Sequence, residues 1–122
     1  MIGTSRRMVC GSMNSGLGDM RQFDVFKNPS QVSSKFAPFV IVLQSSLTQT
    51  KSTVVVAPLV LPSRLPDRSR LFPAVVIGKK EFVMSTNELG AISISRLKEY
   101  VTNLVAERTR VIAAIDMLFS GF

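Results

Sequence analysis

The sequence contains no histidine. Histidine is the commonest general base and a frequent zinc ligand, so its absence excludes Ser-His and Cys-His nucleophile pairs and most zinc sites. The 8 acidic residues are scattered along the chain and provide no evident carboxylate pair. An enzyme with this sequence would have to use arginine, lysine, threonine, serine or aspartate alone. We therefore expect no catalytic centre, no metal site and no cofactor.

Cysteine and long apolar runs are also scarce. Cys10 is the single cysteine, so an internal disulfide is excluded, which fits a reducing compartment. No apolar run approaches the roughly eighteen residues of a membrane span. Arg6-Arg7 is not followed by the apolar segment of an export signal. The expected location is the cytoplasm, without a membrane partner.

The chain is rich in apolar and basic residues. Its 122 residues are 46% hydrophobic and 19% charged, which predicts one globular domain with a single core. Lysine and arginine outnumber acidic residues by 15 to 8, giving a net charge of +7. This excess favours an acidic partner, either nucleic acid or an acidic protein segment, although a solvated basic surface is the simpler interpretation.

Residues 1–20 differ from the rest of the chain. They are rich in glycine, serine and methionine and have no hydrophobic period, so we expect a disordered N-terminal extension followed by a domain at 21–122. Met20 directly precedes the first strand-like segment. We therefore hypothesise that translation naturally starts at Met20.

Short segments with strand periodicity occupy most of the domain. Residues 39–43 are a nearly continuous apolar run, which predicts a central strand covered on both faces. Pro58 lacks a backbone donor, which predicts an edge, a bulge or a strand end there. Gly78 suits a tight connection that needs a left-handed residue. The predicted strands are 22–27, 39–43, 53–60, 72–77, 81–85 and 91–95.

The last twenty residues, 103–122, predict one amphipathic helix, and 96–102 form either a loop or a helical lead-in to it. Asn103 is placed to cap the helix start. Short strands followed by a single helix are typical of a strongly curved antiparallel sheet or small barrel with the helix packed across it. The predicted buried stripe consists of Leu104, Val111, Ile112, Ile115, Leu118 and Phe119.

Several motifs, in order and spacing, resemble the CcdB family of plasmid-type toxins that poison DNA gyrase. The likeness extends over residues 20–122 and is strongest at the C-terminus. The matching segments are MRQFDV at 20–25, FVIVLQS at 39–45, VVVAPL at 54–59, LFPAVVIG at 71–78 and AIDMLFSGF at 114–122.

The resemblance implies an SH3-like barrel, the fold shared with MazF and Kid-type toxins, and a homodimer. It implies binding to the A subunit of DNA gyrase, with DNA contacted only through gyrase, and trapping of the complex that contains cleaved DNA. It also implies a CcdA-like antitoxin whose disordered acidic segment folds onto this basic protein. Such a toxin acts by binding and is not an enzyme.

The resemblance assigns gyrase contact to Ser120, Gly121 and Phe122, with Asp116 one turn earlier and Leu47 nearby. The best-known member has tryptophan in place of Ser120 and isoleucine in place of Phe122. A tryptophan ring stacks on an arginine of its target and a serine does not. Either Phe122 supplies the aromatic contact, or this copy is weak or inactive.

Two alternatives remain open on the sequence. One is an endoribonuclease toxin of the MazF or Kid type on the same fold. The other is a degenerate relative that forms a stable dimer, binds antitoxin and has no toxicity.

Overall fold

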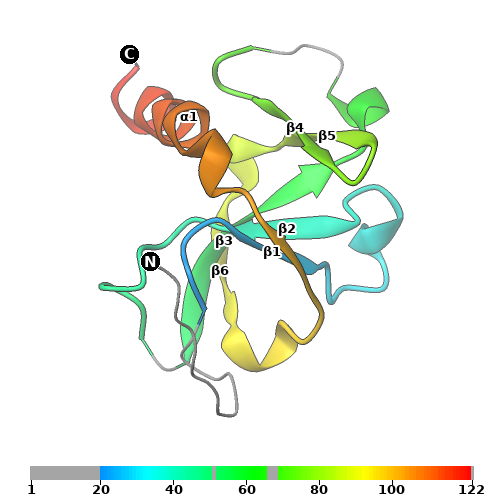
Figure 1. Cartoon of the computed structure of the whole chain (residues 1–122), viewed down its shortest axis with the longest axis vertical. Coiled ribbons are helices and arrows are strands. Elements are labelled where there is room, and N and C mark those ends of the chain that lie inside the picture. The colour runs from blue at the N-terminus through cyan, green and yellow to red at the C-terminus, as the bar shows by residue number, and fades with distance from the viewer. Residues whose placement is uncertain (1–19, 51, 66–68, 122) are drawn as a thin grey trace.

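The computed structural model describes residues 20–50, 52–65 and 69–121. The predicted N-terminal extension, residues 1–19, lies outside them. Within the described residues the chain forms seven strands and one α-helix, separated by short 3-10 turns (Figure 1). The elements are β1 (Asp24–Lys27), β2 (Phe39–Val42), β3 (Thr53–Val60), β4 (Ala74–Ile77), β5 (Lys80–Met84), β6 (Gly90–Ser93), β7 (Tyr100–Asn103) and α1 (Arg108–Ser120).

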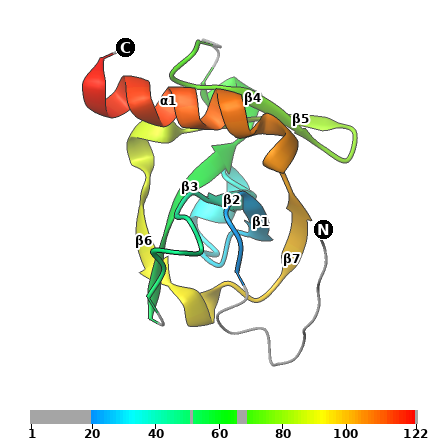
Figure 2. The same cartoon turned by 60° about the vertical axis from the view of Figure 1, so that its left-hand side comes forward.

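The strands form one curled antiparallel sheet in the order β4-β5-β3-β2-β1-β7, with β6 paired to β3. Figure 2 shows α1 lying across one end of the sheet. The predicted fold class, mostly β with a C-terminal helix on a strongly curved sheet, is confirmed. The part of the chain that the structure describes contains no helix with the length and apolar character needed to cross a membrane.

Pro58 lies inside β3, where the strand changes partners. One side of β3 pairs with β6 as far as Val56 and with β5 from Leu59 onwards. The missing N–H of Pro58 therefore falls between two ladders, and its carbonyl still accepts a hydrogen bond from the Ser85 amide at 2.9 Å. The prediction of an edge, bulge or strand end at Pro58 was wrong, because Pro58 lies inside β3. Its missing donor still costs no hydrogen bond of the sheet, since neither β6 nor β5 pairs with β3 at this position.

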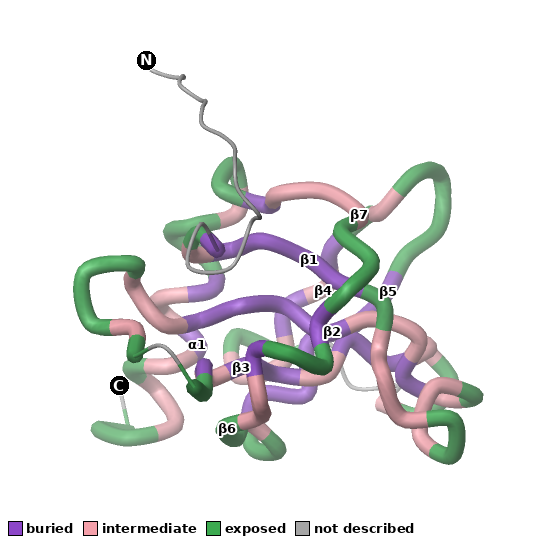
Figure 3. The backbone as a smooth tube through the Cα atoms, turned by 90° about the horizontal axis from the view of Figure 1, so that it is seen from below, coloured by how far each residue is buried: buried purple, intermediate pink, exposed green. Residues whose placement is uncertain are grey.

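Both faces of the central strands are buried. On one face, Val25, Ile41 and Leu59 pack beneath the helix, and on the other face Val40 and Val56 belong to a second cluster. In Figure 3 the backbone along β1 and β2 is coloured purple, for buried residues. The prediction that residues 39–43 form a strand covered on both sides is confirmed, since β-branched residues fill both surfaces of the sheet.

The structure differs from the predicted elements between 96 and 108. Residues 100–103 form β7, which pairs with β1, and the α-helix begins at Arg108 after a 3-10 turn at Val105–Glu107. Asn103 ends β7, yet its Oδ1 accepts the Val105 amide at 2.8 Å. It therefore satisfies a backbone donor at the turn that leads into the helix, rather than at the helix itself.

Asn103 also closes a buried polar contact with the start of β1. Its Nδ2 donates to Asp24 Oδ1 at 2.8 Å, and the Arg21 amide donates to Asp24 Oδ2 at 2.8 Å. Asp24 is 4% exposed. Burial raises the pKa of the Asp24 carboxyl, and the hydrogen bonds from Asn103 and the Arg21 amide oppose that change. The network ties β1 to the strand that precedes the helix.

Stability should depend on the ionisation of Asp24. Because its pKa is raised above the usual 3.8, the folded state binds the proton more tightly than the unfolded state. The free energy of unfolding should therefore fall as pH rises from below 3.8 through the folded-state pKa. Urea unfolding of the wild type and Asp24→Asn across this range measures the effect. We expect the difference between wild type and variant to shrink with rising pH, whereas parallel curves would contradict it.

Candidate functional site at the end of the C-terminal helix

The helix is fixed to the sheet by packing and by one arginine. Val111 and Ala114 are both 0% exposed. Arg110 Nη2 donates to the Ala74 carbonyl of β4 at 2.7 Å, and Arg110 Nη1 forms an ion pair with Glu107 at 2.6 Å. Such contacts hold the helix axis in one orientation relative to the strands, so the position of the helix end is determined by the core.

The last turn of the helix carries exposed side chains. Asp116, Phe119 and Ser120 are all exposed, and residues three or four apart lie on one face of a helix. Figure 2 shows the red end of α1 reaching beyond the strands. This exposed turn, Asp116 to Gly121, is hereafter called the tip.

Gly121 ends the helix in the left-handed conformation. Its φ is +77°, and its amide donates to the Met117 carbonyl at 2.9 Å. A side chain at this φ would strain the backbone, which explains the glycine at the C-cap. The structure thus places Ser120, Gly121 and Asp116 of the predicted site together at the tip, while Phe122 lies outside the described residues.

Phe119 was assigned to the buried stripe, and that prediction was wrong. Its side chain is 71% exposed. At 100° per residue, position 119 lies about 110° from the midpoint between Val111 and Ala114, so the ring projects away from the core. A helical wheel centred on those two residues would have found it. Exposure of a phenyl ring next to Ser120 makes Phe119 an additional candidate contact residue.

Leu47 lies apart from the tip in the single chain. It is 94% exposed in a turn between β2 and β3, where the Ser45 hydroxyl accepts its amide at 3.2 Å. In Figures 1 and 2 this teal segment lies on the same side as the helix end but well below it. A site that combines Leu47 with the tip would require a second copy or a large partner.

The chemistry of the tip is that of a binding surface. It presents a phenyl ring, a hydroxyl and a carboxylate to solvent, and aromatic side chains dominate the energetics of protein interfaces. Among the residues that the structure describes, no three histidine, cysteine, aspartate or glutamate side chains are grouped to hold a metal ion. The arrangement therefore favours recognition of a macromolecule by shape and apolar contact.

Comparison with protein families identifies the family of this chain. The family model described as CcdB protein matches residues 22–121. The chain belongs to the CcdB family. The match extends from the residue before Phe23 to Gly121, and so includes the whole sheet, α1 and the tip up to its last described residue. No curated protein matches the chain.

Membership of the CcdB family indicates a toxin of a toxin–antitoxin pair, and hence an antitoxin partner. The resemblance stated from the sequence motifs is confirmed by the family match. The curled antiparallel sheet with one C-terminal helix is consistent with a CcdB-type fold.

Proposed function

We propose that this CcdB-family protein is a toxin that binds the A subunit of DNA gyrase and traps the complex containing cleaved DNA. The observation that carries the proposal is the tip: a helix seated by Val111 and Ala114 ends in an exposed face with Phe119, Ser120 and Gly121. Positions 119–121 lie in the segment where the chain most resembles gyrase-poisoning members of the family. The function is binding, with no catalytic step.

The mechanism we propose is a shift in population. A ligand that fits only the open state of gyrase, in which the DNA is cleaved, makes that state persist. Two copies in a homodimer would present their tips side by side, as a wedge between the two gyrase A subunits. A CcdA-like antitoxin with an acidic segment would neutralise the toxin, since the chain carries a net charge of +7.

Phe119 can replace the tryptophan that the best-known family member has at the position of Ser120. The phenyl ring is 71% exposed and adjacent to Ser120 along the chain. An exposed aromatic ring over an arginine contributes about 0.5–1 kcal/mol, and more when the contact is desolvated. We infer that the aromatic contact with gyrase needs both Phe119 and the chain end that carries Phe122, and that the Ser120 side chain itself contributes little.

The fate of plasmid DNA and messenger RNA after induction tests the proposal. Expression of the full chain without antitoxin should arrest growth and linearise plasmid DNA, because trapped cleavage complexes are converted to double-strand breaks. Messenger RNA should stay intact. Ribosome-independent cleavage of messenger RNA with intact plasmid would contradict the proposal and favour an endoribonuclease, and normal growth would favour the inactive relative.

A further inference from the structure

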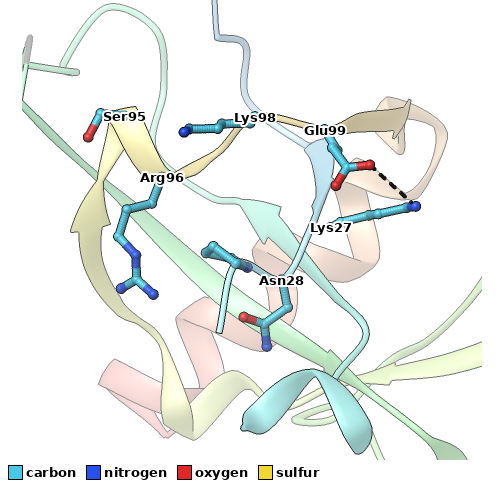
Figure 4. A pocket seen from close by; sticks show the side chains of 7 residues that line it. Lys27, Asn28, Ser95, Arg96, Lys98 and Glu99 are labelled. Atoms are coloured by element: carbon cyan, nitrogen blue, oxygen red, sulfur yellow. Dashed lines mark ion pairs between the residues drawn. The ribbon is translucent and has the colours of Figure 1, made fainter. Parts of the chain in front are cut away.

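A polar pocket lies at the end of the molecule opposite α1. Residues 27–29, at the end of β1, and residues 95, 96, 98 and 99, which lead into β7, line a hollow of about 430 Å³ (Figure 4). We call it the β1–β7 pocket. In Figures 1 and 2 the yellow turn at Ile94–Arg96 lies at the foot of the molecule and the helix at the top, so the pocket is separate from the tip.

Three of the four charged residues that line the pocket are cationic. They are Lys27, Arg96 and Lys98, and the one acidic residue is Glu99. The Glu99 carboxylate already forms an ion pair with Lys27 Nζ at 3.4 Å. Within the described ranges, neither Arg96 nor Lys98 has a hydrogen-bond or ion-pair partner, and both are exposed. Two unpaired cations therefore remain available for an anion.

The backbone positions of the two free cations lie on the same side of the pocket. Leu97 lies between them, is 7% exposed, and has extended backbone angles, so its neighbours at 96 and 98 share the opposite side of the chain. The Leu97 amide donates to the Ile94 carbonyl at 3.0 Å, which closes the turn. Figure 4 shows Arg96 and Lys98 on one side of the pocket and the Lys27–Glu99 pair on the other.

Hydrogen bonds hold the other part of the pocket, at Asn28 and between the backbones of Lys27 and Glu99. Asn28 Nδ2 donates to Ser33 Oγ at 3.0 Å and to the Ala37 carbonyl at 2.8 Å. The Lys27 amide donates to the Glu99 carbonyl at 2.9 Å, joining the two segments that form the pocket. This part of the pocket is therefore preformed, and only the Arg96 and Lys98 side chains have to be ordered when an anion binds.

We propose that the β1–β7 pocket binds a phosphate group. The guanidinium fork of Arg96 matches phosphate oxygens in a bidentate arrangement, and Lys98 adds a point charge. A volume of about 430 Å³ accommodates a ligand of nucleotide size. None of the seven lining residues is aromatic, so no ring stacks on a base. The pocket therefore recognises the phosphate, carried either by a small molecule or by a nucleic-acid backbone.

Titration of the full chain with inorganic pyrophosphate and, separately, with a short duplex oligonucleotide tests this proposal. Chemical shifts in nuclear magnetic resonance locate the site, and fluorescence polarisation gives the oligonucleotide affinity. The pocket variant is Arg96→Gln with Lys98→Gln. The matched control is Lys79→Gln with Lys80→Gln, which removes the same charge from two exposed residues at the β4–β5 turn and the start of β5. Thermal unfolding confirms that both variants are folded.

We expect shifts at residues 27–29 and 95–99, and at least about a tenfold loss of affinity in the pocket variant alone, as charged hydrogen bonds predict. Binding of both probes identifies a small phosphate as sufficient, and binding of the oligonucleotide alone identifies a nucleic-acid backbone as the source. Equal losses in both variants would indicate a general effect of net charge and overturn the proposal. Polyglutamate, titrated in the same way, tests whether any anion is sufficient. Its binding without binding of either phosphate probe, or the absence of any binding, would also overturn the proposal.

Discussion

Removal of residues 120–122 should abolish growth arrest while the domain stays folded. Ser120 and Gly121 are exposed, and the helix remains anchored by Val111 and Ala114, which are both 0% exposed. The thermal midpoint should therefore fall by no more than a few degrees, roughly the effect of losing a helix cap of about 1 kcal/mol. Colony counts after induction and a thermal melt of the purified variant measure the two outcomes.

A single substitution separates the contact surface from the length of the helix. Phe119→Ala in the full chain removes a ring that is 71% exposed, so stability should barely change and toxicity should fall. Val32→Ala removes a side chain that is 79% exposed in the connection between β1 and β2, which lies on the opposite side of the molecule from the red helix end in Figure 1, so it serves as a control away from the tip and should retain toxicity. Undiminished growth arrest after deletion of 120–122 would contradict the assignment of the tip to gyrase.

The substitution Val111→Asp should unfold much of the protein at moderate temperature. Val111 is 0% exposed and belongs to the core cluster between the helix and the sheet. An uncompensated buried charge costs about 3–5 kcal/mol, against a total stability of about 5–15 kcal/mol for a typical domain. The thermal midpoint, measured by circular dichroism, should fall by at least about 15 °C.

Thr109→Asp provides the matched control for this substitution. Thr109 is exposed in the first turn of the same helix, where a negative charge interacts favourably with the helix dipole. Its thermal midpoint should stay within a few degrees of the wild type. Equal losses in the two variants would show that the helix is not clamped to the sheet through Val111.

Hydrophobic periodicity located most of the fold, and tertiary pairing explains what it missed. The apolar run at 39–43 corresponds to β2, and the tight connection predicted at Gly78 corresponds to the β4–β5 turn, where Gly78 has φ +65°. Strand β7 was not predicted because only four residues form it and their partner, β1, lies far back in the sequence. Asn103 looked like a helix cap because its side chain does accept a backbone amide, at Val105.

The candidate site, too, could be predicted only in part from the sequence. The helical end with Asp116, Ser120 and Gly121 was predictable from the family resemblance, but the exposure of Phe119 depends on which helix face the core selects. The β1–β7 pocket could not be predicted from the sequence. Its two walls, at 27–29 and 95–99, are joined by the pairing of β1 with the unpredicted β7 and by the bond between Lys27 and Glu99.

The most direct test of the central claim is a DNA-cleavage assay with purified gyrase, supercoiled plasmid and this protein. The toxin should convert plasmid to the linear form after protein denaturation and digestion, and the variant lacking 120–122 should not. The predicted result is linear DNA with the wild-type protein and none with the variant that lacks 120–122. No linear DNA with the wild-type protein, in an assay where a known gyrase poison works, would contradict the account.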